Sequence, residues 1–428
     1  MNQKFIVCTA PAVCALLLFS AARCAAQESL TWDQAKAKFE AANPALRADA
    51  LGVEEMKAEE ITAFLRPNPT ASFTMDQLYP FGPHYDPNVP GTRYRPFSNA
   101  LTTGSISYLY EREHKRDLRL KSAKEGTEIA QSAHVDLERN LLFNLRSAFV
   151  ETLEAKAVLE LAKADLAYYD HIIQISRDRL HAGDIAQIDL DRIELLRVQY
   201  EVEIQAAIVS LRTAKIQLLQ MLNERTPVEQ FDVTGVFDFT DDLKPLEDFR
   251  KIALDERPDL RAALEAIQQA QTNRKLARAN GSADPTFSVD SGANPPLDPY
   301  VGFNVSIPLR IFDRNQGEKK RTQIDISRDT ELSNGVRAQV FSDVDSAYTE
   351  VESNIALLRP YKAQYKGQAL RVRDTVTYSY EHGGASLMDF LNAQSDYRAV
   401  ELAYLQLVGS YLTAAGQLNL AVGREVIQ

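Results

Sequence analysis

The side chains that catalysis or metal binding would need are present, but their spacing supports neither. Six histidines are scattered along the 428 residues, and no two stand at the i, i+4 spacing of helical zinc ligands. His181 and His382 would ligate a metal only if several copies met there, and solvated side chains are the simpler interpretation. The pair Gly383-Gly384 fits a helix end better than a phosphate loop, and no nucleophile-elbow motif occurs. We therefore predict no enzyme, no cofactor and no metal site.

Two aspartates follow a glycine at the same distance, Asp189 after Gly183 and Asp389 after Gly383. Rings of such carboxylates would favour cations if several copies met around an axis. The same side chains could instead stabilise the first turn of a helix through its dipole. Both interpretations remain open from the sequence.

The first 26 residues have the pattern of a secretory signal peptide. Lys4 supplies the positive start, residues 10–22 are mostly apolar, and small residues lead to a cleavage point after Ala26. All three cysteines lie in or beside this leader, so we expect no disulfide and no thiolate metal site in the mature chain. Lipidation of Cys24 is the alternative, although Arg23 stands where lipoprotein signals have a small residue.

Charge and hydropathy exclude two further classes of protein, those that bind nucleic acids and those with a membrane-spanning helix. The formal net charge is −11, and losing Lys4 and Arg23 with the leader lowers it to −13. Nucleic-acid binding requires a basic surface, so we exclude a nucleic-acid partner. Beyond the leader no run of 18 apolar residues occurs, so no membrane-spanning helix is predicted, and a membrane would be crossed only by a closed β-barrel.

The two halves of the chain resemble each other, which indicates a duplicated unit. Residues 32–65 and 246–280 each read as one helix, and both contain a similar motif around Pro44 and Pro258. Further on, the halves align without a gap at an offset of 200 residues. The identical positions in the first half are Gly183, Asp189, Glu201, Ser210, Thr213, Ala214, Gln217 and Leu218. We predict a signal peptide over 1–26, a first repeat over 27–235 and a second over 236–428.

Proline placement shows where very long helices can form, since proline in a helix interior costs about 3 kcal/mol. Residues 98–225 contain no proline, and Pro360 alone follows residue 309. Residues 111–180 and 313–381 are therefore predicted as helices of roughly 100 Å each. The helices after each glycine carry a seven-residue apolar rhythm, which fits antiparallel coiled coils and ordinary helical bundles equally well.

Four segments, about 69–79, 101–110, 285–290 and 300–309, alternate apolar and small polar side chains. This alternation is typical of strands in a membrane barrel, and a half-buried soluble sheet would show it too. Four strands cannot close a barrel alone, and an open strand edge is costly in lipid. Two copies would bring together eight strands around a filled interior, whereas three copies would bring together twelve around an open lumen.

This duplicated plan of helix, two strands, long helix, Gly-x5-Asp turn and helix resembles the TolC-type outer membrane factors of tripartite efflux and type I secretion. The resemblance covers nearly the whole mature chain, and the short termini resemble the heavy-metal (cobalt–zinc–cadmium resistance) branch. It implies a mainly α-helical fold with four transmembrane strands per chain. It also implies a homotrimer with a twelve-stranded β-barrel in the outer membrane and a periplasmic helical barrel. The implied partners are a periplasmic adaptor and an inner-membrane pump.

The resemblance also assigns candidate site residues. The tips on which adaptors of the family dock are matched by Gly183, Asp184, Gly383, Gly384 and Ser386. The acidic residues that narrow the family's periplasmic entrance are matched by Asp189 and Asp389, and the tyrosine that holds it closed by Tyr380. The family's gating arginine falls on Ala385 and its second acidic position on Asn392. We therefore expect weaker gating bonds and a smaller negative ring than in the family.

The resulting prediction is an outer-membrane channel subunit that conducts solutes passively and catalyses no reaction. The alternative is a periplasmic coiled-coil adaptor or structural protein, which would leave the four strands without a role. The exported substrate, the pump and the open or closed state of the entrance leave no signal in the sequence.

Overall fold

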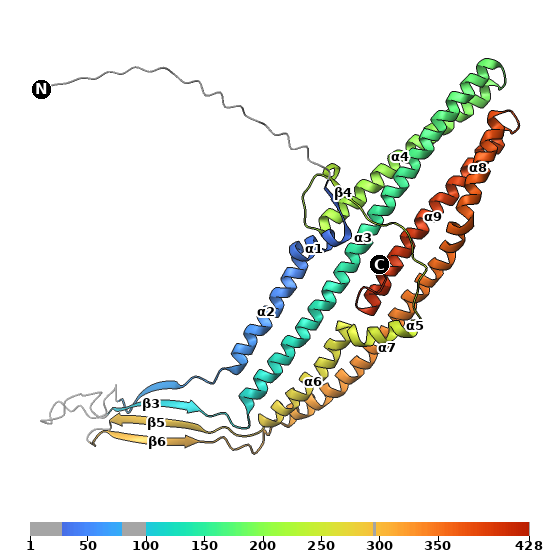
Figure 1. The fold of residues 1–428 in the computed structure, drawn as a ribbon. Helices are drawn as coiled ribbons and strands as arrows, with labels where there is room; N and C mark the ends of the chain where they lie inside the picture. The colour runs from blue at the N-terminus through green and yellow to red at the C-terminus, as the bar shows by residue number, and fades with distance from the viewer. Residues whose placement is uncertain (1–27, 79–99, 294–296, 428) are drawn as a thin grey trace, which may run out of the picture.

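The computed structural model describes residues 28–78, 100–293 and 297–427. The predicted signal peptide and Cys24 lie outside these residues, so cleavage and lipidation stay predictions. The described chain is an elongated, curved array of antiparallel helices (Figure 1). A sheet of four strands lies at one end, and two helix-to-helix turns lie at the other.

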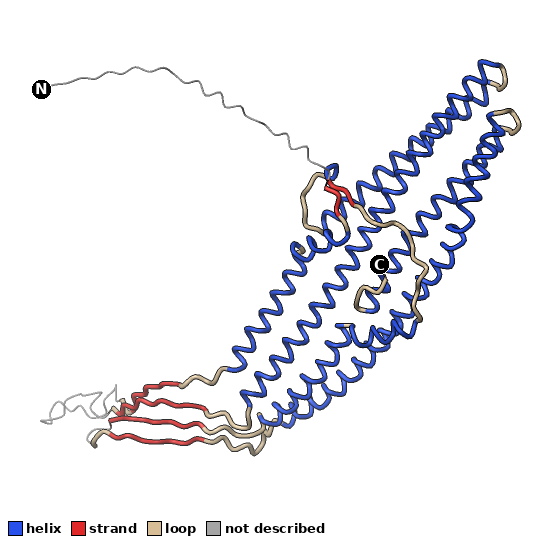
Figure 2. Tube along the Cα trace, in the orientation of Figure 1, coloured by secondary structure: helices blue, strands red, loops and turns tan. Residues whose placement is uncertain are grey.

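The elements follow each other in two similar series (Figure 2). The first comprises β1 (Glu28–Leu30), α1 (Trp32–Ala42), α2 (Pro44–Phe64), β2 (Thr70–Asp76), β3 (Leu101–Leu109), α3 (Lys115–Ala182), α4 (Gln187–Met221), a 3-10 turn (Val228–Gln230) and β4 (Phe231–Val233). The second comprises α5 (Leu246–Glu256), α6 (Pro258–Ala279), β5 (Thr286–Ala293), β6 (Tyr300–Ser306), α7 (Gln316–Pro360), a π-helical turn (Tyr361–Tyr365), α8 (Lys366–Glu381) and α9 (Leu387–Val422). The prediction of a mainly helical fold with four strands in a duplicated helix–strand–strand–helix plan is confirmed.

The first predicted helix of each half is in fact two helices. α1 and α2 meet at Asn43, and α5 and α6 meet at Arg257, each of which has an extended backbone conformation. Both residues precede a proline, whose ring disfavours the helical conformation of the residue before it. Asn43 then caps α2, because its Oδ1 accepts hydrogen bonds from the backbone N–H groups of Ala45 (2.9 Å) and Leu46 (3.0 Å).

The long helices of the two halves also differ. α3 runs without interruption for 68 residues, as predicted. The prediction of one continuous helix over 313–381 is wrong, because a π-helical turn separates α7 from α8 directly after Pro360. Pro360 has no N–H to donate, and its ring crowds the carbonyl four residues earlier. A widened turn is one of the ways in which a helix accommodates such a residue.

The larger sheet is antiparallel with the order β2-β3-β5-β6, so the hairpins of the two halves pair through β3 and β5. A second, smaller sheet was not predicted. In it β1 pairs in parallel with β4, so the start of the described chain lies beside residues 231–233. Strands of three residues are too short to show a period-two pattern in the sequence.

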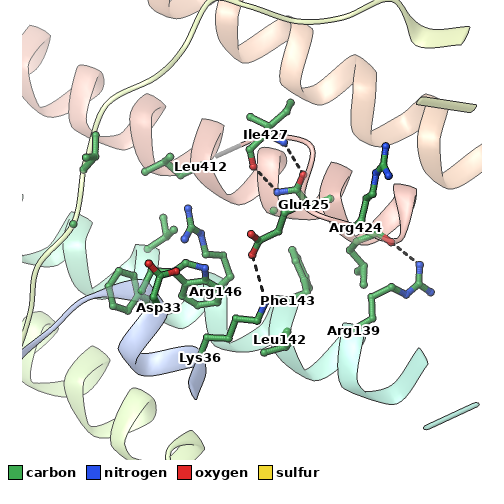
Figure 3. Close-up of a pocket in the computed structure, with 18 of the residues that line it drawn as sticks. Asp33, Lys36, Arg139, Leu142, Phe143, Arg146, Leu412, Arg424, Glu425 and Ile427 are labelled. Atoms are coloured by element: carbon green, nitrogen blue, oxygen red, sulfur yellow. Dashed lines mark hydrogen bonds and ion pairs between the residues drawn. The ribbon is translucent and has the colours of Figure 1, made fainter. Parts of the chain in front are cut away.

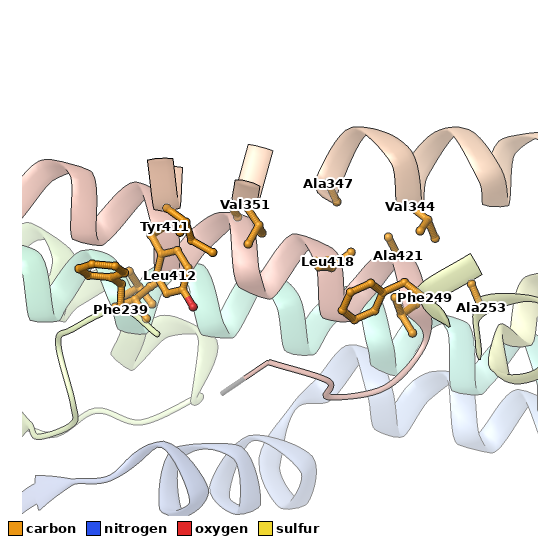
Figure 4. Close-up of a cluster of buried hydrophobic side chains, with 14 of the residues drawn as sticks. Phe239, Phe249, Ala253, Val344, Ala347, Val351, Tyr411, Leu412, Leu418 and Ala421 are labelled. Carbon is orange, nitrogen blue, oxygen red and sulfur yellow. The ribbon is translucent and has the colours of Figure 1, made fainter. Parts of the chain in front are cut away.

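The buried side chains form a strip between the helices rather than a single compact core. Figure 4 shows its largest part, in which Phe249 from α5 and Val344 from α7 face Leu418 from α9. A second cluster around Phe39 and Leu145 joins α1 to α3, and a third lies close to the turns at the far end. Within the described ranges, no helix combines the length and the apolar character that crossing a membrane requires.

Candidate functional site: an exposed sheet face and two helical tips

The larger sheet carries an apolar face that no core covers. The strand register aligns Ala71, Ile106, Val289 and Phe303 in one row across all four strands. These side chains are exposed, with Phe303 83% and Ile106 63% accessible. A contiguous row of exposed apolar side chains indicates contact with an apolar environment or with another protein surface.

The opposite face of the sheet is polar. Ser72 and Ser105 form a hydrogen bond of 2.9 Å between β2 and β3, and Asp290 and Gly302 continue the same row. A Cβ atom on residue 302 would lie 2.5 Å from Oδ2 of Asp290. The glycine therefore leaves room for a carboxylate on this face, and the period-two alternation predicted for the strands is present.

The outer strands of this sheet, β2 and β6, each form one of its edges. In the part of the chain that the structure describes, β2 pairs with β3 alone and β6 pairs with β5 alone. Each outer strand therefore has one edge whose N–H and C=O groups lack a partner strand. Such edges are templates for pairing with a further strand.

The first tip is the turn between α3 and α4. Gly183 has a φ of +82°, a conformation that favours glycine, and its N–H donates to the carbonyl of Leu180 at 3.0 Å. The N–H of Asp184 donates to the carbonyl of Arg179 at 2.9 Å. α4 then begins after Ala186, which has no side chain able to cap it, and the half-buried Asp189 lies in its first turn.

The second tip, between α8 and α9, is capped more completely. Gly383 has a φ of +74°, and the N–H of Gly384 donates to the carbonyl of Ser379 at 2.7 Å. Oγ of Ser386 accepts from the N–H of Asp389 (3.2 Å), and the Asp389 carboxylate accepts from the N–H of Ser386 (3.1 Å). Hydrogen bonds from Ser386 hold the pKa of the exposed Asp389 carboxyl below its usual value. Asp389 thus has a capping role.

Tyr380 lies beneath the tips rather than on their surface. It is 3% exposed and stacks on Phe390, with 5.0 Å between ring centroids. The guanidinium of Arg179 lies 5.0 Å from the Tyr380 ring centroid and donates to the Tyr380 carbonyl oxygen at 2.5 Å. Sequence reasoning missed Arg179, which ties the end of α3 to the end of α8.

The remaining predicted positions are Ala385, just before α9, and Asn392, within α9. Ala385 is half-buried against the apolar cluster around Tyr380, and Asn392 is exposed one turn after Asp389. Leu190 and Leu387, which are neighbours of the two candidate aspartates, belong to that same cluster. The two tips of one chain therefore form one packed unit, and Asp189 and Asp389 each lie in the first turn of their helix.

A partly buried group of charges further along the same helices was also missed. Nη1 of Arg398 on α9 donates to Glu203 on α4 at 2.9 Å, and Nε of Arg398 lies 3.4 Å from Asp165 on α3. We call these three residues the inter-hairpin clasp. Burial raises the pKa of the Asp165 carboxyl to about 6, with further increases from Glu203 and Glu401 and opposite effects from Arg398 and Arg373.

The chain also encloses a cavity of about 740 Å³ between α1, α3, α9 and the segment after β4 (Figure 3). Trp32 and Phe149 contribute to its wall, together with Arg139, Arg146 and Glu425. None of the predicted site residues lines it.

Comparisons with known proteins agree with this architecture. Residues 250–424 match the family model described as outer membrane efflux protein. The chain is 23% identical over 331 residues to the cobalt-zinc-cadmium resistance protein CzcC of Cupriavidus metallidurans, which covers 76% of this chain and 78% of that protein. It is 22% identical over 309 residues to the outer membrane efflux protein BepC of Brucella suis, which covers 67% of this chain and 64% of that protein.

Solved structures of membrane channels have the same fold. A crystal structure of CusC superposes with a TM-score of 0.74 at 16% identity, covering 92% of each chain. The open-state MtrE outer membrane channel of Neisseria gonorrhoeae gives a TM-score of 0.72 at 17% identity, covering 92% of this chain and 89% of that one. Residues 250–424 therefore carry the outer membrane efflux protein domain, and the chain as a whole has the fold of these channels.

Proposed function

We propose that three copies of this chain form an outer-membrane channel, a passive conduit in a tripartite efflux or type I secretion system. The observation that carries the proposal is the larger sheet. It has one exposed apolar face, one polar face and two unpaired edges. The alternative of a periplasmic adaptor gives this sheet no role.

Closing the sheet requires strands from further copies. An unpaired backbone group costs several kcal/mol in lipid, so neither β2 nor β6 can remain an open edge there. Pairing β6 of one copy with β2 of the next removes both edges at once. Three copies bring together twelve strands, which leaves a lumen lined by the polar rows that include Ser72 and Asp290.

The helical end supports the proposed partners, a periplasmic adaptor and an inner-membrane pump. Both tips present an exposed large apolar side chain at equivalent positions, Ile188 at 57% and Met388 at 56% accessibility. Gly183, Asp184, Gly383, Gly384 and Ser386 are exposed beside them. Exposed apolar side chains next to bare backbone suit the packing of another helical hairpin, so we assign adaptor docking to these tips.

A cysteine cross-linking experiment tests the trimer. The three native cysteines all lie in the predicted leader, so Ser72→Cys on β2 can be combined with Tyr300→Cys, Gly302→Cys or Asn304→Cys on β6. We expect one of these pairs to give covalent trimers under oxidation in outer membranes. The Ser72→Cys variant alone is the control and should give none. A monomer that stays soluble without detergent would instead support the adaptor alternative.

The entrance residues are tested by conductance. We propose that Asp189 and Asp389 form the negative ring of the periplasmic entrance, with Asn392 as its uncharged second position and Tyr380 packed beneath it. The double variant Asp189→Ala, Asp389→Ala should lower cation preference in planar bilayers and leave trimers intact. Asp191→Ala, an exposed neighbour on α4, is the control. Unchanged ion selectivity in the double variant would remove both aspartates from the site.

The cargo we propose to test first is a divalent metal cation, because a cobalt-zinc-cadmium resistance protein is among the relatives. A strain that lacks this chain should become more sensitive to cobalt, zinc and cadmium salts, and the wild-type gene should restore tolerance. A strain sensitive only to organic drugs would assign the channel to a different pump.

A further inference from the structure

We propose that the cavity between α1, α3 and α9 is a binding site for a small amphipathic carboxylate, with Arg146 as the residue that holds the carboxylate group. No part of the transport function proposed above uses this cavity. Its volume of about 740 Å³ lies within the range of roughly 300–1,000 Å³ that is usual for small-molecule sites.

Arg146 is the first reason for the assignment. Its guanidinium stacks over the Trp32 ring, 4.6 Å from the ring centroid, and Trp32 in turn packs edge-on against Phe149. Among the described residues, no acceptor lies within hydrogen-bond or ion-pair distance of the Arg146 guanidinium. Burial lowers the pKa of Arg146, opposed by the charges of Glu425 and Asp33. A stacked, half-buried guanidinium with unused N–H groups presents the planar fork that binds carboxylates.

A second arginine on the same face of α3 also has an unused donor. Arg139 stands seven residues before Arg146 and lines the same cavity. Two of its nitrogens are engaged, because Nη1 donates to the carbonyl of Leu420 and Nη2 donates to Asp136. Its buried Nε–H has no acceptor in the described chain. Buried donors normally have partners, so the unused N–H groups of the two arginines indicate that an acceptor is missing from the cavity. Arg139 is already paired with carboxylates, so the missing charge is the one opposite Arg146.

Most of the acidic side chains at the cavity are engaged elsewhere or exposed. Glu425 lies 3.9 Å from Lys36, as the dashed line in Figure 3 marks, and Asp238 accepts from Lys362 at 2.6 Å. Asp33 is exposed. These acids leave the guanidinium of Arg146 without a direct counterion, which is the charge that a bound carboxylate would supply.

The rest of the wall favours an apolar body on the ligand. Leu142, Phe143, Leu412 and Ile427 contribute side chains from α3, α9 and the C-terminal segment. Asn419 fixes this segment against α9, since its Oδ1 accepts from the N–H groups of residues 426 (2.7 Å) and 427 (2.9 Å). The cavity thus joins a cationic end to an apolar wall, which is the complement of an alkyl or aryl carboxylate.

The cavity lies against the central helices of the array. α3 and α9, which line it, lie in the middle, whereas α2 and α4 bound the array on one side and α7 and α8 on the other (Figure 1). A second copy that pairs with β2 or β6 would meet those flanking elements.

Trp32 makes the proposal directly testable, because it is the single tryptophan of the chain and lies in the cavity wall. Octanoate is titrated into the full-length chain in lipid nanodiscs while Trp32 emission is recorded, and isothermal titration calorimetry provides a second readout. We expect saturable binding of octanoate, and octan-1-ol at the same concentrations should bind at least about tenfold more weakly.

Two arginine variants separate the site from a general effect of charge. Arg146→Gln should weaken octanoate binding about tenfold or more, and Arg146→Lys should weaken it less. Arg116→Gln is the matched control, because Arg116 also lies on α3 and stacks on an aromatic ring, that of Phe64, at 4.3 Å. Circular dichroism confirms that each variant is folded. Equal binding of octanol, unchanged affinity in Arg146→Gln or the absence of saturation would overturn the proposal.

Discussion

The two halves of the chain follow one plan but differ in the continuity of their long helices and in the capping of their tips. The long helix of the first half, α3, is unbroken, whereas the second half divides its counterpart into α7 and α8 with a π-helical turn after Pro360. The tip of the first half has no side-chain cap on α4, while the second has a reciprocal Ser386–Asp389 capping box on α9. The difference indicates a rigid first hairpin and a second hairpin that can bend in its shaft but has a fixed tip.

The halves also supply opposite charges to the inter-hairpin clasp. Asp165 and Glu203 come from the first half, and Arg398 comes from the second. The ring of Tyr200 lies 5.1 Å from the Arg398 guanidinium and covers its other side. One cation therefore contacts two acids, the buried Asp165 and the half-buried Glu203, across the boundary between the hairpins.

The largest effect is expected from Arg398→Ala. Removing this guanidinium leaves the buried Asp165 and the half-buried Glu203 without their shared cation, which should destabilise the fold by about 3 kcal/mol. The apparent melting temperature at a fixed scan rate is the measurement. Arg192→Ala, at an exposed position on α4, is the control and should change it little. An unchanged melting temperature in Arg398→Ala would show that the clasp does not join the halves.

A smaller effect that depends on pH is expected from Asp165→Asn. Because burial raises the pKa of Asp165 in the fold to about 6, the folded state binds this proton more tightly than the unfolded chain does. The contribution of this group to the free energy of unfolding is therefore fully present below about pH 4 and is lost as the pH rises through about 6. Asparagine imitates the protonated acid. At pH 8 the variant should therefore be more stable than the wild type by about 1–3 kcal/mol and should melt at a higher temperature. The gain should disappear at pH 4, and an equal gain at both values would exclude this titration.

Pro360→Ala tests the bend in the second hairpin. Alanine restores the missing N–H and removes the crowding ring, so α7 and α8 should merge into one helix like α3. We expect a gain of about 1 kcal/mol and slower amide hydrogen exchange at residues 361–365. Glu352→Ala, an exposed position in α7, is the control. Exchange that stays fast would show that the π-helical turn has another cause.

The smallest effects are expected at the tips, where the cap can be removed from one half and added to the other. Ser386→Ala should cost about 1 kcal/mol by uncapping α9. Ala186→Ser should stabilise α4 by about 0.5–1 kcal/mol, because position 186 has the extended backbone of an N-cap. Hydrogen exchange in the first turn of each helix measures both changes. If Ser386→Ala left hydrogen exchange in α9 unchanged, or Ala186→Ser left it unchanged in α4, the inferred difference between the tips would be contradicted.

Most of the fold could be predicted because its signals are periodic or local. The absence of proline predicted α3, and the alternation around Phe303 predicted a strand with one apolar face. The breaks at Asn43 and Arg257 were missed, although the proline after each was a local signal that could have placed them. Of the candidate site, the sequence placed both tips correctly on helix-to-helix turns but could not show that Tyr380 is buried against Phe390.

The sequence by itself determined the duplication, the unbroken run of α3 and the alternation of the strands. The helix and strand signals depend on residues a few positions apart. The duplication depends on a single offset between the halves that recurs at many positions. Only the tertiary structure decided which distant side chains meet, across the halves as with Arg179 and Tyr380 or Arg398 and Asp165, and within the first half as with Arg146 and Trp32. The physical reason is that packing angles and helix register bring distant residues together, and two positions separated by 201 residues, as Arg179 and Tyr380 are, share no periodic pattern that would reveal their contact.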